Sequence, residues 1–240
     1  MMFYRNEKIE QIAETRILDF EKALGRPATY PFDIELYGEQ VLGLSMLWDE
    51  IEELPGEEIL AGLCATRKLI VMNENRRIHL EEKPGRCRLT QGHEMGHWDL
   101  FVDLSKLEHP ALFETRSDEV FAYRSTPGGD VQVLKMLLAC EEGRELLRAI
   151  NARADSPDEA RSVNRYAAAV LMPRTVIADE VKRINRTRWP DLYNLAERRF
   201  GVTISALRVR LEQLNLLYVD QATGTIYESR DHANGQQRLF

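Results

Sequence analysis

The apolar side chains near the N-terminus recur with helical spacing. Between residues 6 and 25 they appear every three or four positions among charged residues, a pattern that predicts an amphipathic helix. The apolar positions are Ile9, Ile12, Ala13, Ile17, Leu18, Phe20 and Leu24. Gly25 and Pro27 are expected to end this helix. A second short helix is expected after Pro31, from about residue 32 to residue 41.

From residue 42 to residue 73 the pattern changes to short apolar runs. They are bounded by Pro, Gly and Asn, which is typical of strands rather than helices. We expect three strands, at residues 44–48, 59–63 and 68–72, and we expect them to form one small sheet.

The remaining pattern predicts mainly helices. Residues 86–102 follow Pro84-Gly85 and have no internal proline, so they are expected to form one helix. Residues 130–153 show a further helical pattern. Ser156 and Pro157 suit the cap and first turn of a helix that runs through residues 160–172.

These elements predict an α+β fold, in which a small three-stranded sheet packs on helices and a helical module follows. We expect a core domain at 1–173, with a helical insertion at 130–155 that acts as a lid, as a docking surface, or only in packing. The helical module is expected at 174–228. Residues 229–240 are expected to form a loose tail.

Composition narrows the class of protein. Of 240 residues, 44% are hydrophobic and 30% charged, as in soluble globular proteins, and no run approaches the roughly 18 apolar residues of a membrane helix. The N-terminus becomes charged within five residues and does not resemble a signal peptide, so we expect a cytoplasmic protein with no membrane partner. The net charge of −7 argues against a protein that binds polyanions over its whole surface. Cys64, Cys87 and Cys140 form no CxxC pair and are interpreted as reduced thiols.

The sequence His93-Glu94-Met95-Gly96-His97 carries the candidate chemistry. Two histidines four residues apart on a helix project from one face, so both rings can reach one metal ion. Zinc suits imidazole ligands, and Mn or Fe also fits a site of histidines and carboxylates. Glu94 is then placed to act as the general base on a metal-activated water. The alternative is an ordinary surface helix with two unrelated histidines.

Histidines elsewhere give weaker signals. His79, His109 and His232 have no partner at ligand spacing, so we expect them to be solvated or locally hydrogen-bonded rather than metal-bound.

Three stretches of the chain resemble the ImmA/IrrE family of metallopeptidases. Residues 86–97, RCRLTQGHEMGH, resemble the family's active helix, and residues 164–173, NRYAAAVLMP, resemble the helix that follows it. Residues 195–214 are similar to the helix-turn-helix-like tail of many members. The resemblance implies a cytoplasmic zinc endopeptidase that cleaves a helix-turn-helix repressor of the Xre type and so derepresses stress-response or mobile-element genes.

The third metal ligand is where this sequence departs from the family. The resemblance implies a ligand Glu four residues before Asn164, and it implies that Asn164 orients a metal-bound histidine. Position 160 is Ala, and the nearest acid is Glu159, about 100° away around a helix. Three alternatives remain open: Glu159 is the ligand through an adjusted helix start, Asp118 or Glu119 reaches in, or the site has only two protein ligands.

The C-terminal region is locally basic. Residues 174–218 hold nine Lys and Arg against five acids, and Gly201-Val202-Thr203 followed by Ser205 fits the turn of a helix-turn-helix. Arg208 and Arg210 are candidates for contacts with nucleic acid or a partner. The alternative, which we favour over DNA binding, is that the module packs on the core or docks a repressor. Its buried side would then be formed by Leu207, Leu211, Leu214 and Leu216. A catalytically weak regulator that binds a repressor or DNA without cleavage is the second functional hypothesis.

Overall fold

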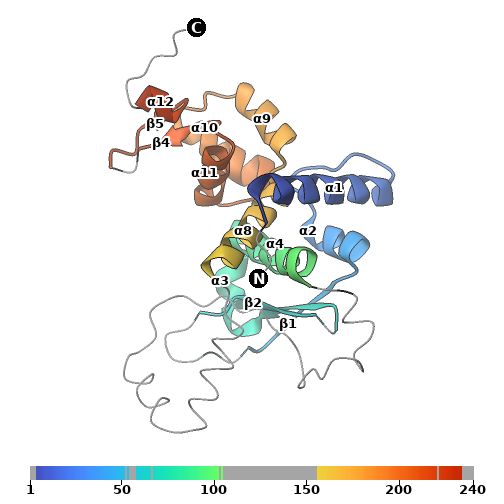
Figure 1. The fold of residues 1–240 in the computed structure, drawn as a ribbon. Coiled ribbons are helices and arrows are strands. Elements are labelled where there is room, and N and C mark those ends of the chain that lie inside the picture. Colours follow the sequence, from blue (N-terminus) through green and yellow to red (C-terminus); the bar gives the residue numbers. More distant parts are fainter. Residues whose placement is uncertain are drawn as a thin grey trace.

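The computed structural model describes residues 4–51, 53, 58–65, 67–102, 104, 156–220 and 222–233. The insertion predicted at 130–155 lies outside the described residues, as do His109, Asp118, Glu119 and Cys140. In the described part, a small sheet lies on one side of two central helices, and the N-terminal and C-terminal helices lie on the other (Figure 1). Within these residues, no helix is long and apolar enough to cross a membrane.

The N-terminal helix forms as its apolar spacing predicts. Helix α1 spans Asn6–Leu24, and Gly25 ends it in a left-handed conformation with φ of 64°, which glycine adopts without strain. The second helix is shorter than expected. Helix α2, Ile34–Tyr37, is capped by the side chain of Asp33 and continues as a π-helical turn, η1, at Gly38–Leu42.

The predicted sheet is confirmed, with strand ends shifted by one or two residues. Strands β1 (Ser45–Asp49), β2 (Ala61–Cys64) and β3 (Leu69–Asn73) lie in the order β1-β3-β2. Strand β3 pairs parallel to β1, with Leu47 opposite Val71, and antiparallel to β2. The fold class is therefore α+β, with a small sheet packed on helices.

Two helices occupy the centre of the molecule. Helix α4, Pro84–Phe101, crosses helix α8, Pro157–Leu171, and α4 also packs against β2 and β3. Ser156 caps α8 as predicted, because its Oγ accepts a hydrogen bond of 3.2 Å from the backbone N–H of Glu159. The 3₁₀ turn η2 (Glu74–Arg76) and the short helix α3 (Arg77–Glu81), which precede α4, had no clear pattern in the sequence.

The C-terminal region is helical with one addition. Its elements are α9 (Arg174–Lys182), α10 (Trp189–Asn194), the π-helical turn η4 (Leu195–Phe200), α11 (Ile204–Gln213), β4 (Tyr218–Val219), β5 (Ile226–Tyr227) and α12 (Arg230–Ala233). The antiparallel pair β4-β5 was not predicted. Helix α12 lies in the stretch expected to be loose, and residues 234–240 lie outside the described part.

The described residues before and after position 173 contribute to one hydrophobic core. Leu207 and Leu211 of α11 are fully buried, and they belong to the same cluster as Ile9 of α1 and Val163 of α8. The C-terminal helices therefore pack on the core rather than standing apart from it. The domain boundary at 173/174 stays a prediction from the sequence.

A buried ion cluster joins the two ends of the chain. Arg210 of α11 is 0% exposed, and its two terminal nitrogens donate to the carboxylate oxygens of Glu10 at 2.6 and 2.8 Å. Arg165 donates to Glu10 at 3.1 Å, and Arg210 Nε donates to the Met172 carbonyl oxygen at 3.0 Å. Burial alone would raise the pKa of Glu10, but the hydrogen bonds from Arg210 and the nearby arginine charges outweigh it and lower this pKa.

Replacing Arg210 should strongly destabilise the fold. Arg210→Ala leaves the buried Glu10 carboxylate with a single partner, so we expect a loss of about 3–5 kcal/mol in the free energy of unfolding, measured by urea denaturation at pH 7. Because the pKa of Glu10 is lowered in the folded state, its contribution is present at neutral pH and lost as the pH falls through the acid range. Arg161→Ala, which removes an exposed pair with Asp158, is the control and should change little. Equal effects of the two variants would contradict the role given to the buried cluster.

Candidate metal site

Helix α4 buries most of its second half. The residues from Thr90 to Trp98 are all buried, and His93, Glu94 and His97 are 1%, 0% and 4% exposed. Met95, 0% exposed, belongs to the hydrophobic core. Three ionisable side chains at this depth require polar partners, because burial of an unpaired polar group is costly.

Helix α8 approaches α4 unusually closely at two glycines. A Cβ atom placed on Gly92 would lie 3.0 Å from the Cβ of Ala167, and one placed on Gly96 would lie 3.0 Å from the Cβ of Val163. Because the two glycines are one turn apart, they form a smooth strip along α4 into which α8 fits. The small residue that the sequence places at position 96 is thus required by helix packing.

The close approach brings a side chain of α8 to each histidine. Asn164 Oδ1 lies 3.0 Å from Nδ1 of His93, which is the contact that the family resemblance implies. Glu159 Oε1 lies 3.6 Å from Nδ1 of His97. The other nitrogens of the two rings face each other, with 3.1 Å between Nε2 of His93 and Nε2 of His97.

These contacts determine what the two facing nitrogens can bind. If Asn164 Oδ1 accepts a hydrogen bond from Nδ1–H of His93, then Nε2 of the neutral ring carries a lone pair. The same reasoning applies to His97 if Glu159 accepts from its Nδ1. Two lone pairs facing each other at 3.1 Å repel unless a cation lies against both. For zinc bonds of about 2.0–2.1 Å in a tetrahedral site, the two nitrogens would be about 3.3 Å apart, which is close to the observed separation of 3.1 Å. A hydrogen bond between the rings is the alternative, and it requires the proton of His97 to lie on Nε2.

Glu159 lies at the ring nitrogen of His97 that is opposite the one facing His93. Its carboxylate faces Nδ1 of His97, whereas the nitrogens that fit a metal are the two Nε2 atoms. Within the ranges that the structure describes, no group of three or more His, Cys, Asp or Glu side chains is arranged to hold a metal ion. The alternative ligands Asp118 and Glu119 lie outside those ranges.

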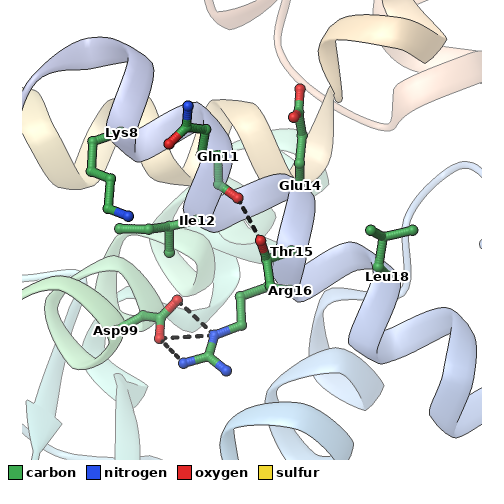
Figure 2. Close-up of a pocket in the computed structure, with 8 residues that line it drawn as sticks. All are labelled: Lys8, Gln11, Ile12, Glu14, Thr15, Arg16, Leu18 and Asp99. Atoms are coloured by element: carbon green, nitrogen blue, oxygen red, sulfur yellow. Dashed lines mark hydrogen bonds and ion pairs between the residues drawn. The ribbon is translucent and has the colours of Figure 1, made fainter.

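A hydrogen-bonded network at the end of α4 had no signal in the sequence. Asp99, two residues after His97, has a nearly buried carboxylate that accepts hydrogen bonds from Arg16 Nε at 3.0 Å and from the Tyr166 hydroxyl at 2.9 Å. Figure 2 shows Arg16 reaching from α1 to Asp99 at the edge of a surface pocket of about 680 Å³. Hydrogen bonding to Asp99 raises the pKa of Arg16, and burial raises that of Tyr166. The network holds the last turn of α4 against α1 and α8.

Two of the other histidines and two of the three cysteines lie in the described part of the chain. His79 Nε2 lies 2.5 Å from a terminal nitrogen of Arg86, a local contact of the expected kind. His232 lies in α12 and is exposed. Cys64 is buried and Cys87 is half-buried. Burial raises the pKa of Cys87 to about 11, so this thiol is protonated and unreactive at neutral pH.

The prediction of surface contacts through Arg210 is wrong. Its guanidinium is fully buried against Glu10, because position 210 lies on the same side of α11 as Leu207 and Leu211. Arg208 is half-buried. The second helix is capped by Thr203, whose Oγ1 accepts from the backbone N–H of Ala206, rather than opened by Ser205.

Part of the positive charge in this region is neutralised by local acids. Ion pairs join Lys182 to Asp179, Arg183 and Arg199 to Glu180, and Arg186 to Glu228. The region 174–218 therefore offers fewer unpaired cations to a phosphate backbone than its composition suggests.

Comparisons with known proteins give little further information. No protein-family model matches the sequence, and no curated protein matches it. Among the solved structures to which the chain is similar is a Mycobacterium tuberculosis transcriptional regulator, with 16% sequence identity and a TM-score of 0.45. The match covers 94% of this chain and 57% of that chain, so this chain spans little more than half the length of that structure. A likeness at this level carries no argument about function.

The close helix contact can be tested at Gly96. In an open helix, Gly→Ala would stabilise the protein by up to about 1 kcal/mol. Here the new methyl group would meet both Cβ and Cα of Val163, at 3.0 and 3.1 Å, so we expect Gly96→Ala to destabilise the fold by about 1–3 kcal/mol in thermal or urea unfolding. A single variant more stable than the wild type would show that α4 and α8 are not in this contact.

Proposed function

We propose that the protein is a metal-dependent endopeptidase of the ImmA/IrrE type, with a protein substrate. The observation that carries the proposal is the convergence of the two Nε2 atoms of His93 and His97, 3.1 Å apart, with Asn164 at the outer nitrogen of His93. Zinc is the expected metal, with Mn or Fe as alternatives. The resemblance of residues 86–97 and 164–173 to the family's two motifs supports the same conclusion.

The chain's own residues would divide the work of peptide hydrolysis. His93 and His97 would hold the metal through Nε2, and the bound metal would polarise a water and the scissile carbonyl. Asn164 would keep the ring of His93 in the orientation that ligation needs. Glu94 would take the proton of the attacking water and deliver it to the leaving amine. Because the Glu94 side chain is buried, bulk water would be excluded from its carboxylate, and this would favour the proton transfer.

The proposed substrate is a helix-turn-helix repressor of the Xre type, whose cleavage would derepress stress-response or mobile-element genes. This part of the proposal rests on the family resemblance. The C-terminal helices support a role in protein contacts more than one in DNA contacts, because the Arg210 guanidinium is buried and several other cations are paired with acids.

A catalytically weak regulator, which binds a repressor without cleaving it, is the second candidate. It is favoured by one observation: the described residues offer two histidine nitrogens at the site but no third ligand from a histidine, cysteine or carboxylate. Metal analysis separates the two functions, because a weak or empty metal site would remove the nucleophile that the peptidase needs.

The metal prediction concerns the two histidines. We expect the purified wild-type protein to bind one equivalent of zinc, measured by elemental analysis after dialysis against buffered zinc. His93→Ala and His97→Ala should each abolish this binding, because a single imidazole holds zinc only weakly. His232→Ala, which changes an exposed histidine in α12, is the matched control and should bind like the wild type. Zinc retained without either His93 or His97 would refute the site.

The catalytic prediction concerns Glu94. Glu94→Gln should keep the fold and the bound metal but lose cleavage by at least about 100-fold, because an amide cannot accept the proton of the attacking water. The measurement is cleavage of Xre-type repressors, each co-expressed with the protein and analysed by gel electrophoresis. If the variant cleaves a repressor at the wild-type rate, Glu94 is not the base. If neither protein cleaves any repressor while both bind it, the regulator function is the better account.

A further inference from the structure

The register of α8 against α4 determines where Glu159 can reach. Val163 lies against Gly96, and Ala167 lies against Gly92. Asn164 follows Val163 by one residue, about 100° around the helix, and so it emerges beside the contact and reaches His93. Glu159 precedes Val163 by one turn, and it therefore shares the side of α8 that faces the α4 backbone.

This register brings Glu159 to the outer nitrogen of His97. Its Oε1 lies 3.6 Å from Nδ1, whereas Nε2 of the same ring faces His93. The Glu159 side chain is 30% exposed, and the ring of His97 is 5% exposed. The carboxylate is thus the less confined member of the pair, and a change in its torsion angles could shorten the contact to a hydrogen bond of about 2.8 Å.

We propose that Glu159 is a positioning residue whose carboxylate accepts a hydrogen bond from Nδ1–H of His97, and that Glu159 is not a metal ligand. This inference rests on the proposed metal site for its functional meaning. Helix α8 would then contact both rings at Nδ1, the nitrogen that does not face the other ring. The Asn164 amide would contact His93, and the Glu159 carboxylate would contact His97. The arrangement is that of a carboxylate–histidine–metal triad, in which the outer partner fixes the tautomer and makes the imidazole a stronger donor.

The two roles predict different responses to the same substitutions. A positioning residue needs only an acceptor oxygen, which the Gln side chain also has. A metal ligand at this position needs the carboxylate charge, because a neutral amide oxygen is a poor ligand for zinc. The comparison of Glu159→Gln with Glu159→Ala therefore separates the two roles. Asp158→Asn, at an exposed acid paired with Arg161, is the matched control.

The first experiment measures zinc affinity by competition with a chromophoric chelator. If Glu159 positions His97, Glu159→Ala should weaken zinc binding by about 10–100-fold, and Glu159→Gln should retain most of the wild-type affinity. Asp158→Asn should bind like the wild type. Equal losses of affinity in Glu159→Gln and Glu159→Ala would overturn the proposal in favour of direct ligation.

The second experiment needs no metal. Two-bond ¹H–¹⁵N correlation spectra of the metal-free protein, labelled in its histidines, report which ring nitrogen carries the proton. In the metal-free protein the facing Nε2 of His93 opposes the Nδ1–H form of His97, so the test is a comparison between variants. We expect a larger fraction of the Nδ1–H form of His97 in the wild type and in Glu159→Gln than in Glu159→Ala. Asn164→Ala should lower the Nδ1–H fraction of His93 in the same way.

The spectra also separate this inference from the proposed function. An unchanged His97 tautomer in Glu159→Ala would overturn the positioning role, whatever the zinc affinity of the protein. A wild-type protein that binds no zinc but shows the expected tautomer shift would refute the metallopeptidase proposal and leave the contact between Glu159 and His97 established.

Discussion

The close contact between α4 and α8 is the constraint on which the site depends. At Gly92 and Gly96 the two helices approach so nearly that a single methyl group on α4 would crowd Ala167 or Val163. Only at this separation can a side chain as short as Asn164 reach across to Nδ1 of His93. The glycines cost some helix stability through the entropy of the unfolded chain. Close packing of α8 and the hydrogen bond to a buried histidine offset that cost.

Helix α4 is also fixed at its two ends, by parts of the chain that are distant in sequence. At the N-terminal end, a Cβ on Gly85 would lie 2.6 Å from backbone atoms of Val202 and Thr203, so the turn before α11 rests directly on this glycine. At the C-terminal end, Asp99 is held by Arg16 and Tyr166. The candidate histidines lie between these anchors. The helix-turn-helix-like segment thus supports the helix that carries the site, and its turn is occupied by that contact.

Local patterns in the sequence predicted the elements well, because hydrophobic periodicity and capping residues act over a few positions. The three strands, α1, α4 and the Ser156 cap of α8 all follow from such signals. The prediction for Glu159 depended on a finer quantity, the rotation of α8 about its axis. One residue changes that rotation by about 100°, and the sequence left three alternatives open. Val163 and Ala167 fix the rotation of α8 because they pack against Gly96 and Gly92 of α4. This rotation puts Glu159 at Nδ1 of His97, and no local pattern in the sequence reveals it.

The wrong prediction for Arg210 shows how a sequence can indicate an ion pair between residues that are far apart in the chain. Arg210 lies three residues after Leu207 and one before Leu211, so helical spacing puts its charge on the buried side of α11. Glu10 is likewise a charged residue on the buried side of its helix, α1. It lies between the buried residues Ile9 and Ala13 and is itself 3% exposed. A charge on an apolar stripe is tolerated in a core only when an opposite charge meets it. Two helices that each carry one such charge, of opposite sign, are therefore candidates to pack together, although here the pair is separated by 200 residues of chain. By this rule Arg210 belongs to the core, and nucleic-acid contact is left to other side chains of α11.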